Sequence, residues 1–166
     1  GARVVLRKGD AVRSLPLEDF YLAYQKTALE PGEFLQAIQV PPQPAGRLFR
    51  TWKVSKREDQ DISAVCAAFA LDLADGVVRG ARIAFGGMAA TPLRARATES
   101  FLLDKPWSTE TVDAAATLLA NEYTPLSDMR ASSAYRRVSA AGLLRRLWLE
   151  HTDTAPARLC DLEELA

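Results

Sequence analysis

The sequence predicts an α+β fold, in which an antiparallel β-sheet is followed by a helical bundle packed against it. The first half of the chain, up to Phe85, contains short β-like runs separated by Gly, Pro and Asp. After Thr91-Pro92 the spacing of apolar residues changes from two to about 3.6 residues, which is typical of helices. Because strands and helices are grouped along the chain, a parallel α/β sheet is not expected.

The first thirty residues predict a hairpin and a short helix. β-like runs at Arg3 to Arg7 and Arg13 to Leu17 flank Gly9-Asp10, a common composition for a hairpin turn. The stretch from Asp19 to Leu29 has a helix-like pattern that Pro31-Gly32 ends. We therefore expect two strands and one helix in this part of the chain.

The middle of the chain predicts further strands. Glu33 to Val40 has a β-like pattern that ends at Pro41-Pro42, and the stretch PPQPAG indicates a connection between two structural units. Three strong strand candidates follow, at Leu48 to Val54, Ile62 to Leu73 and Val77 to Phe85. Asp75-Gly76 between the last two predicts a long hairpin, because Gly accepts the positive φ that the turn requires. Its second arm would place Ala81, Ile83 and Phe85 on a buried face and Gly80, Arg82 and Ala84 on the other.

Three helices are expected in the second half of the chain. The first covers Ala95 to Leu103, and Ser108 or Thr109 would cap the second. The apolar face of the second helix would be Val112, Ala115, Ala116 and Leu119. The third helix, Ser133 to about Thr152, would bury Ala134, Val138, Ala141, Leu144 and Trp148, with Arg136, Arg137, Arg145 and Arg146 largely elsewhere. The tail, APARLCDLEELA, predicts a last short helix or a frayed end.

Composition excludes several classes of protein. The 21 basic and 21 acidic residues balance, which removes the field that a nucleic-acid or polybasic membrane protein uses. Cys66 and Cys160, the only cysteines, cannot form an iron–sulfur or structural metal site, and Cys66 reads as a small buried hydrophobe. The only histidine, His151, lies near the end of a predicted helix and is not expected to be a catalytic base. We expect no nucleic-acid or membrane partner.

The beginning of the chain bears on location and completeness. GARVVLRKGD lacks the apolar centre of a signal peptide, and no apolar run approaches membrane-spanning length. The cytoplasm is therefore the expected location. A chain that begins with Gly in place of Met is expected to be part of something longer.

A dense charged cluster lies directly against a segment that must be buried. In KVSKREDQDISAV, Lys53 to Val65, no Gly, Pro or Asn separates the charges from the apolar run. We therefore expect this polar cluster at the edge of the core, where a bound ligand would meet it. Gly86-Gly87 lacks the context of a dinucleotide fingerprint and predicts a tight turn that closes the sheet, though a glycine pair also permits close backbone approach.

Three ordered motifs resemble one family. WKVSKREDQDISAV, GARIAFGGMAATPLRA and PLSDMRASSAYRRV are similar to the C-terminal domain of the FAD-containing subunit in the xanthine dehydrogenase and carbon monoxide dehydrogenase family. SKREDQDISAVCAAF looks most like the small subunit of bacterial xanthine dehydrogenase. By this resemblance, residues 1–45 are the end of the FAD-binding domain and residues 46–166 are the domain that follows it.

The resemblance implies an electron-transfer role in a larger complex. In this family a substrate such as xanthine is hydroxylated at a molybdenum cofactor, and electrons pass through iron–sulfur clusters to FAD and then to NAD. The implied partners are the upstream FAD-binding and iron–sulfur segment and a molybdenum-binding large subunit, in a homo- or hetero-oligomer. The iron–sulfur cysteines and the pyrophosphate-binding glycine segment of the family do not occur in this chain, so this chain alone is expected to be inactive.

The resemblance also implies cofactor-binding residues. Lys53 would offer FAD a cation, Leu35 an apolar contact, and the loop from Ser55 to Asp61 would border the side from which NAD arrives. The candidates are Lys53, Leu35, Arg57, Asp61, Ser55 and Lys56. Asp61 has a competing role, because it could anchor the loop by accepting backbone hydrogen bonds.

A second family motif and a second function are also considered. Asp128, Arg130, Tyr135 and Arg136 match a family motif, for which we expect a structural polar network at the start of a helix and at a subunit contact. The whole chain could also act as a non-catalytic scaffold that packs the flavin domain and docks the molybdenum subunit. A functional loop predicts that substitutions of Lys53 or Arg57 impair NAD reduction, whereas a scaffold predicts loss only from packing residues such as Phe85 or Trp148.

Overall fold

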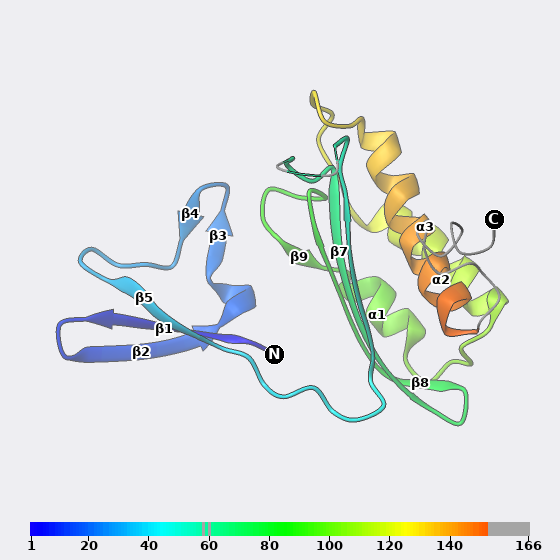
Figure 1. Ribbon diagram of the computed structural model, residues 1–166, viewed down its shortest axis with the longest axis horizontal. Coiled ribbons are helices and arrows are strands. Elements are labelled where there is room, and N and C mark those ends of the chain that lie inside the picture. Colours follow the sequence, from blue (N-terminus) through cyan, green and yellow to red (C-terminus); the bar gives the residue numbers. More distant parts are fainter. Residues whose placement is uncertain (58, 60, 153–166) are drawn as a thin grey trace.

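The computed structural model describes residues 1–57, 59 and 61–152, which form two units. Residues 1–39, here the N-terminal unit, contain short strands, and residues 48–152, here the C-terminal unit, contain a larger sheet and three helices. Residues 40–47 connect the two (Figure 1). The boundary expected after residue 45 falls in this segment and, as a domain boundary, stays a prediction. The expected structure of the tail lies outside the described residues, as do Cys160 and Glu58.

A three-stranded antiparallel sheet dominates the N-terminal unit. Its strands are β1 (Arg3–Lys8), β2 (Ala11–Pro16) and β5 (Phe34–Gln39), in the order β2-β1-β5. Between β2 and β5 lie the 3₁₀ turn η1 (Leu17–Asp19) and the short strands β3 (Tyr21–Ala23) and β4 (Lys26–Thr27). The small core of this unit consists of Val4, Leu6 and Phe20.

The helix expected from Asp19 to Leu29 is wrong. The chain forms η1 and the β3–β4 hairpin there, with Tyr21 opposite Thr27. Gln25 turns the hairpin with a φ of 54°, and the N–H of Ala28 donates to the carbonyl of Phe20 at 2.9 Å. Only one large apolar side chain of the stretch, Phe20, is buried, so a helix would have gained little packing and local turn geometry prevails.

The C-terminal unit confirms the α+β prediction. Its antiparallel sheet consists of β6 (Leu48–Val54), β7 (Val65–Ala74), β8 (Val77–Gly86) and β9 (Leu93–Arg94), in sequential order. The helices are α1 (Arg96–Leu102), α2 (Thr109–Glu122) and α3 (Ser133–His151), and all three cover one face of the sheet (Figure 1). Three strands were expected, and β9 adds a fourth, because Leu93 and Arg94 pair with Phe85 and Ala84.

Local signals in the sequence account for the element ends. The predicted β7–β8 hairpin is confirmed, with Asp75 and Gly76 at φ values of 52° and 71°. Ser108 caps α2 and accepts a hydrogen bond from the N–H of Thr111, as its position predicts. β7 begins at Val65, whereas the sequence predicted a start at Ile62; residues 62–64 still belong to the preceding loop.

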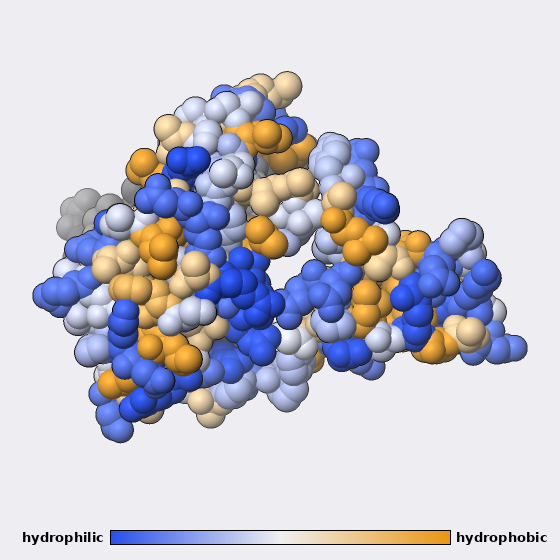
Figure 2. All heavy atoms as spheres, turned by 180° about the vertical axis from the view of Figure 1, so that it is seen from behind, coloured by the Kyte–Doolittle hydropathy of each residue, from blue (hydrophilic) through white to orange (hydrophobic). Residues whose placement is uncertain are grey.

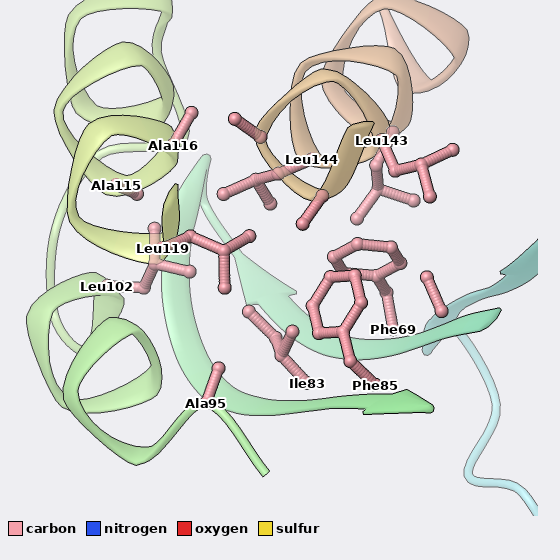
Figure 3. Packing of buried hydrophobic residues seen from close by; sticks show 14 of the residues in the cluster. Phe69, Ile83, Phe85, Ala95, Leu102, Ala115, Ala116, Leu119, Leu143 and Leu144 are labelled. Atoms are coloured by element: carbon pink, nitrogen blue, oxygen red, sulfur yellow. The ribbon is translucent and has the colours of Figure 1, made fainter. Parts of the chain in front are cut away.

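The main core lies between the helical layer and one face of the sheet. Phe69, Ile83 and Phe85 point from the strands toward the helices (Figure 3). The rings of Phe69 and Phe85 meet edge to face at a centroid distance of 5.7 Å. The facing helical residues include Leu102, Ala115, Ala116, Leu119 and Leu144. Alternation along β7 and β8 therefore turns one face of the sheet toward the core and leaves the other without a helical cover.

The buried face of α3 differs from the predicted one. Ala141 and Leu144 are buried as expected, but Ala134 is exposed and Val138 is 71% exposed. The residues of α3 that are buried are Arg136, Ala140, Ala141, Leu143, Leu144 and Leu147. Arg136, expected largely elsewhere, is buried because three oxygen atoms accept hydrogen bonds from its guanidinium group, which an apolar pattern cannot reveal.

Candidate functional site

The face of the sheet that carries no helix has small side chains on β7 and β8 in two neighbouring rows. Cross-strand pairing places Lys53 of β6 opposite Cys66 of β7, and Cys66 opposite Gly86 of β8. The next row along the same face is Thr51, Ala68, Ala84 and Arg94. We call this surface the open face. The N-terminal unit lies on this side of the sheet (Figure 1), and an open gap separates parts of the two units (Figure 2).

Cys66 corrects one expectation. It was expected to be a small buried hydrophobe, but it is exposed, whereas its neighbours Val65 and Ala67 are buried. The reason is the strand period of two, which sends Cys66 to the open face and its neighbours to the core. The alternation of large and small residues in VCAAFAL was the available signal for a face that a flat group could cover.

The six predicted site residues divide between the two units. Lys53 is exposed on the open face and has no ion-pair partner in the described part of the chain. Leu35 lies on β5 in the N-terminal unit, opposite Leu6, and is 39% exposed. The other four follow β6 in the loop of residues 55–61. Among described residues no hydrogen bond joins Leu35 to the others, so its part in a shared site stays a prediction.

Three of these loop residues use their side chains within the protein. The hydroxyl of Ser55 donates to the carbonyl of Arg57 at 2.7 Å. Lys56 Nζ donates to the carbonyl of Met129 at 2.7 Å, which ties this loop to the segment before α3. Asp61 Oδ2 accepts the backbone N–H groups of Lys56 and Arg57, each at 3.1 Å. Asp61 is therefore an anchor of the loop.

The charge of Asp61 is maintained by the loop that it anchors. Its partial burial opposes ionisation, but hydrogen bonds from the N–H groups of Arg57, Ile62 and Lys56 and the charge of Arg57 outweigh that effect. The pKa of Asp61 therefore lies below its ordinary value. Arg57 Nη2 is 3.6 Å from Asp61 Oδ1, yet its side chain is 74% exposed. Lys53 and Arg57 are thus the cations whose charged groups are most available to a ligand in this region.

A buried guanidinium group fixes the base of the same region. Arg136 Nη1 donates to the carbonyls of Ala64 and Gly87, and Nη2 donates to Asp128 Oδ1 at 2.7 Å. Asp128 also accepts the N–H groups of Arg130 and Ala131 at 2.9 and 3.1 Å. This geometry agrees with the expected network for three of its four residues.

Tyr135 is the residue of that motif that stands outside this network. Its side chain is 50% exposed, and its backbone N–H binds the capping hydroxyl of Ser132. The contacts of Arg136 with Ala64 and Gly87 were not visible in the sequence. They join α3 to the start of β7 and to the Gly86-Gly87 turn, at the end of the open face.

Two hollows lie away from the open face. Open hollows of about 570 and 230 Å³ lie on the helical side, at the start of α3 and between α2 and α3. No residue of the open face lines either of them. Across residues 1–57, 59 and 61–152, acidic, Cys and His side chains do not gather in threes as a metal ion requires. The helices of the same residues are also too short or too polar to cross a membrane.

Two family profiles match this chain. Residues 50–151 match the CO dehydrogenase flavoprotein C-terminal domain, and residues 1–43 match the FAD binding domain in molybdopterin dehydrogenase. Nicotinate hydroxylase of Emericella nidulans is 36% identical over 89% of this chain and 12% of its own length. The xanthine dehydrogenase FAD-binding subunit of Escherichia coli O157:H7 is 30% identical over 81% of this chain and 47% of its own length.

A solved structure agrees with these matches. A chain of the Cu,Mo-CO dehydrogenase in its cyanide-inactivated form superposes with a TM-score of 0.82 and 30% identity, over 93% of this chain and 54% of that one. Fold and sequence thus define a class, the flavoprotein components of molybdenum hydroxylases. The chain belongs to the CO dehydrogenase flavoprotein C-terminal domain family. It spans about half the length of the E. coli subunit and of the CO dehydrogenase chain.

Proposed function

We propose that this chain forms one wall of the FAD site in a molybdenum hydroxylase that uses NAD as electron acceptor. The observation that carries the proposal is the open face, where β7 and β8 present small side chains and Lys53, which has no ion-pair partner among the described residues, lies at the β6 edge. The face looks across a gap toward the unit that matches the FAD-binding profile. Relatives named for FAD binding and for molybdenum support it.

The residues present fit a flavin. Ala68, Ala84 and Gly86 leave room for a flat ring against the strands, where larger side chains would exclude it. A cation near a flavin favours the negative charge of the reduced form, a role available to Lys53. Bound FAD would supply the two-electron chemistry that connects iron–sulfur clusters on other parts of the complex to NAD.

The charged loop is the proposed border of the NAD entrance. Asp61 and Ser55 hold its shape through hydrogen bonds, and Lys56 fixes it to Met129. Arg57 remains largely exposed and supplies a positive charge for an anionic dinucleotide. The hydroxylated substrate would be selected at the molybdenum centre. Similar proteins are named for different substrates, namely nicotinate, xanthine and CO.

Lys53→Ala tests the FAD wall in the complete flavoprotein subunit. We expect an FAD dissociation constant about tenfold higher than in the wild type, the size of a lost charge-assisted hydrogen bond. The constant is measured by titrating FAD into flavin-free protein and following flavin fluorescence. In the assembled enzyme, where oxidation of the substrate at the molybdenum centre supplies the electrons, Arg57→Ala should slow NAD reduction while reduction of an artificial dye is maintained.

Arg50→Ala is the matched control for Lys53→Ala. Arg50 is an exposed cation on the same strand, but it points to the helical side, where its Nε lies 3.6 Å from Glu150 Oε2. It should leave FAD binding unchanged. If Lys53→Ala binds FAD as tightly as the wild type, Lys53 is not part of the wall; if the wild-type subunit binds no FAD, the proposed function itself is wrong.

An interaction role is the second candidate, and one observation favours it. Large apolar side chains are exposed on α3 and the segment before it, with Val138 71%, Leu126 78% and Met129 83% exposed. Such a surface is typical of a contact with another subunit. A scaffold without a flavin role predicts that substitutions of these residues impair assembly and that Lys53→Ala has no effect.

A further inference from the structure

The two units are joined by an ionic contact on one carboxylate oxygen. Glu18, in η1 of the N-terminal unit, accepts hydrogen bonds at Oε2 from Arg96 at 2.6 Å and from Arg94 at 3.2 Å. Arg94 ends β9 and Arg96 begins α1, both in the C-terminal unit. Within the described residues, every hydrogen bond that crosses between the units ends on this oxygen.

Arg94 is held in place by contacts within its own unit, independently of Glu18. Its Nε and Nη2 donate to the two carboxylate oxygens of Glu99 at 2.9 and 2.6 Å. The side chain of Glu99 is only 7% exposed, and its Oε1 also accepts the N–H of Ile83 at 2.7 Å. Such a two-point contact fixes the plane of a guanidinium group. Arg94 therefore presents Nη1 in a set direction, as a fixed donor for Glu18.

The position of this contact determines what it can do. Arg94 lies opposite Ala84, in a row that includes Ala68 and Thr51 of the open face. The connecting segment, residues 40–47, enters the sheet at β6, which is the opposite edge. Three strand spacings, about 14 Å in all, separate β6 from β9. A covalent tether at one edge and an ionic tether at the other restrict how the N-terminal unit can rotate over the open face.

We propose that Glu18 is a positioning residue for the FAD site, which holds the two walls of the gap in the arrangement that binds the cofactor. This inference rests on the proposed function. Without the ionic tether the two walls sample more relative arrangements. The apparent affinity for FAD then falls in proportion to the fraction of molecules whose walls are in the arrangement that binds FAD. The side chain of Glu18 is 40% exposed, and partly exposed ion pairs contribute little each. The expected effect is therefore moderate, about fivefold in the dissociation constant.

Glu18→Ala in the complete flavoprotein subunit tests the tether. The expected result is an FAD dissociation constant about fivefold higher, with a thermal midpoint of the flavin-free protein close to that of the wild type. The matched control is Glu33→Ala. Glu33 binds Arg13 through two hydrogen bonds of 2.7 Å, but both residues lie within the N-terminal unit. FAD binding by Glu33→Ala should match the wild type.

A double-variant cycle separates positioning from direct contact with FAD. If Glu18 acts through the arginines, Arg96→Ala alone weakens FAD binding, and Glu18→Ala with Arg96→Ala is weaker by less than the sum of the two. Additive effects, or an unchanged constant for Glu18→Ala, would overturn the tether and leave the FAD site standing. A wild-type subunit that binds no FAD would instead overturn the proposed function.

Discussion

Gly87→Ala is a sharp test of how the sheet, the loop and α3 are joined. Gly87 has a φ of +81°, and a Cβ atom at this position would overlap the carbonyl oxygen of Ala64 and lie 3.0 Å from Arg136 Nη1. Both contacts are parts of the clamp in which Arg136 donates to Ala64 and Gly87. An added methyl group must therefore displace backbone or a buried guanidinium group.

The magnitude has two contributions. A left-handed conformation costs an alanine roughly 1–2 kcal/mol. Weakening the hydrogen bonds of a charged, buried group costs about 1.5–3 kcal/mol more. We expect Gly87→Ala to lower the free energy of unfolding by about 2.5–5 kcal/mol in total.

Gly46 supplies the control, because it has a nearly equal φ of +78° and no atom within 4 Å of the position of a Cβ. Gly46→Ala should show the backbone cost alone. The difference between the variants, about 2 kcal/mol, corresponds to a thermal midpoint about 4–8 °C lower for Gly87→Ala than for Gly46→Ala. Thermal unfolding of the flavin-free subunit, followed by circular dichroism, measures this difference. Equal midpoints for the two variants would refute the close approach of Gly87, Ala64 and Arg136.

Two further predictions concern acid stability and the open face. Hydrogen bonds from the N–H groups of Ala131 and Arg130 and from Arg136 hold the pKa of Asp128 at about 2, against the opposing effect of burial. Because this pKa lies below its ordinary value, the stabilisation is present above about pH 4 and is lost as the pH falls toward 2. The thermal midpoint of Asp128→Asn should therefore fall less steeply than that of the wild type between about pH 4 and pH 2. A parallel fall in both proteins would contradict this prediction. Cys66 is exposed on the open face, and bound FAD should slow its alkylation by iodoacetamide; an unchanged rate in FAD-saturated protein would place the cofactor elsewhere.

The sequence determined the elements whose signals are local. The Asp75-Gly76 turn, the Ser108 cap and the alternation of Ile83 and Phe85 along β8 predicted hairpin, helix start and buried face correctly. Three ordered motifs identified the family, because a family shares residues at fixed places along the chain. The helix expected from Asp19 to Leu29 failed because its weak pattern came without a second large buried apolar residue.

The candidate site could be predicted only in part. Lys53 and the charged loop stood out because charges adjoin a buried strand without an intervening turn residue. The role of Asp61 as a loop anchor was an alternative that its hydrogen bonds now support. The exposure of Cys66 could not be predicted, because it depends on which face of β7 packs against the helices. The period of two along a strand separates the two faces but does not say which one is buried.

By itself, the sequence determined the fold class, the family and the place of the charged loop beside a core strand. Tertiary structure decided which residues from distant parts of the chain meet. Arg136 reaches Ala64 and Gly87, and Glu18 reaches Arg94, across separations of 72, 49 and 76 residues. The sequence indicated a polar network for Arg136 but named neither the carbonyl partners of Arg136 nor the arginine partners of Glu18, because only chain folding brings these donors and acceptors within hydrogen-bond distance.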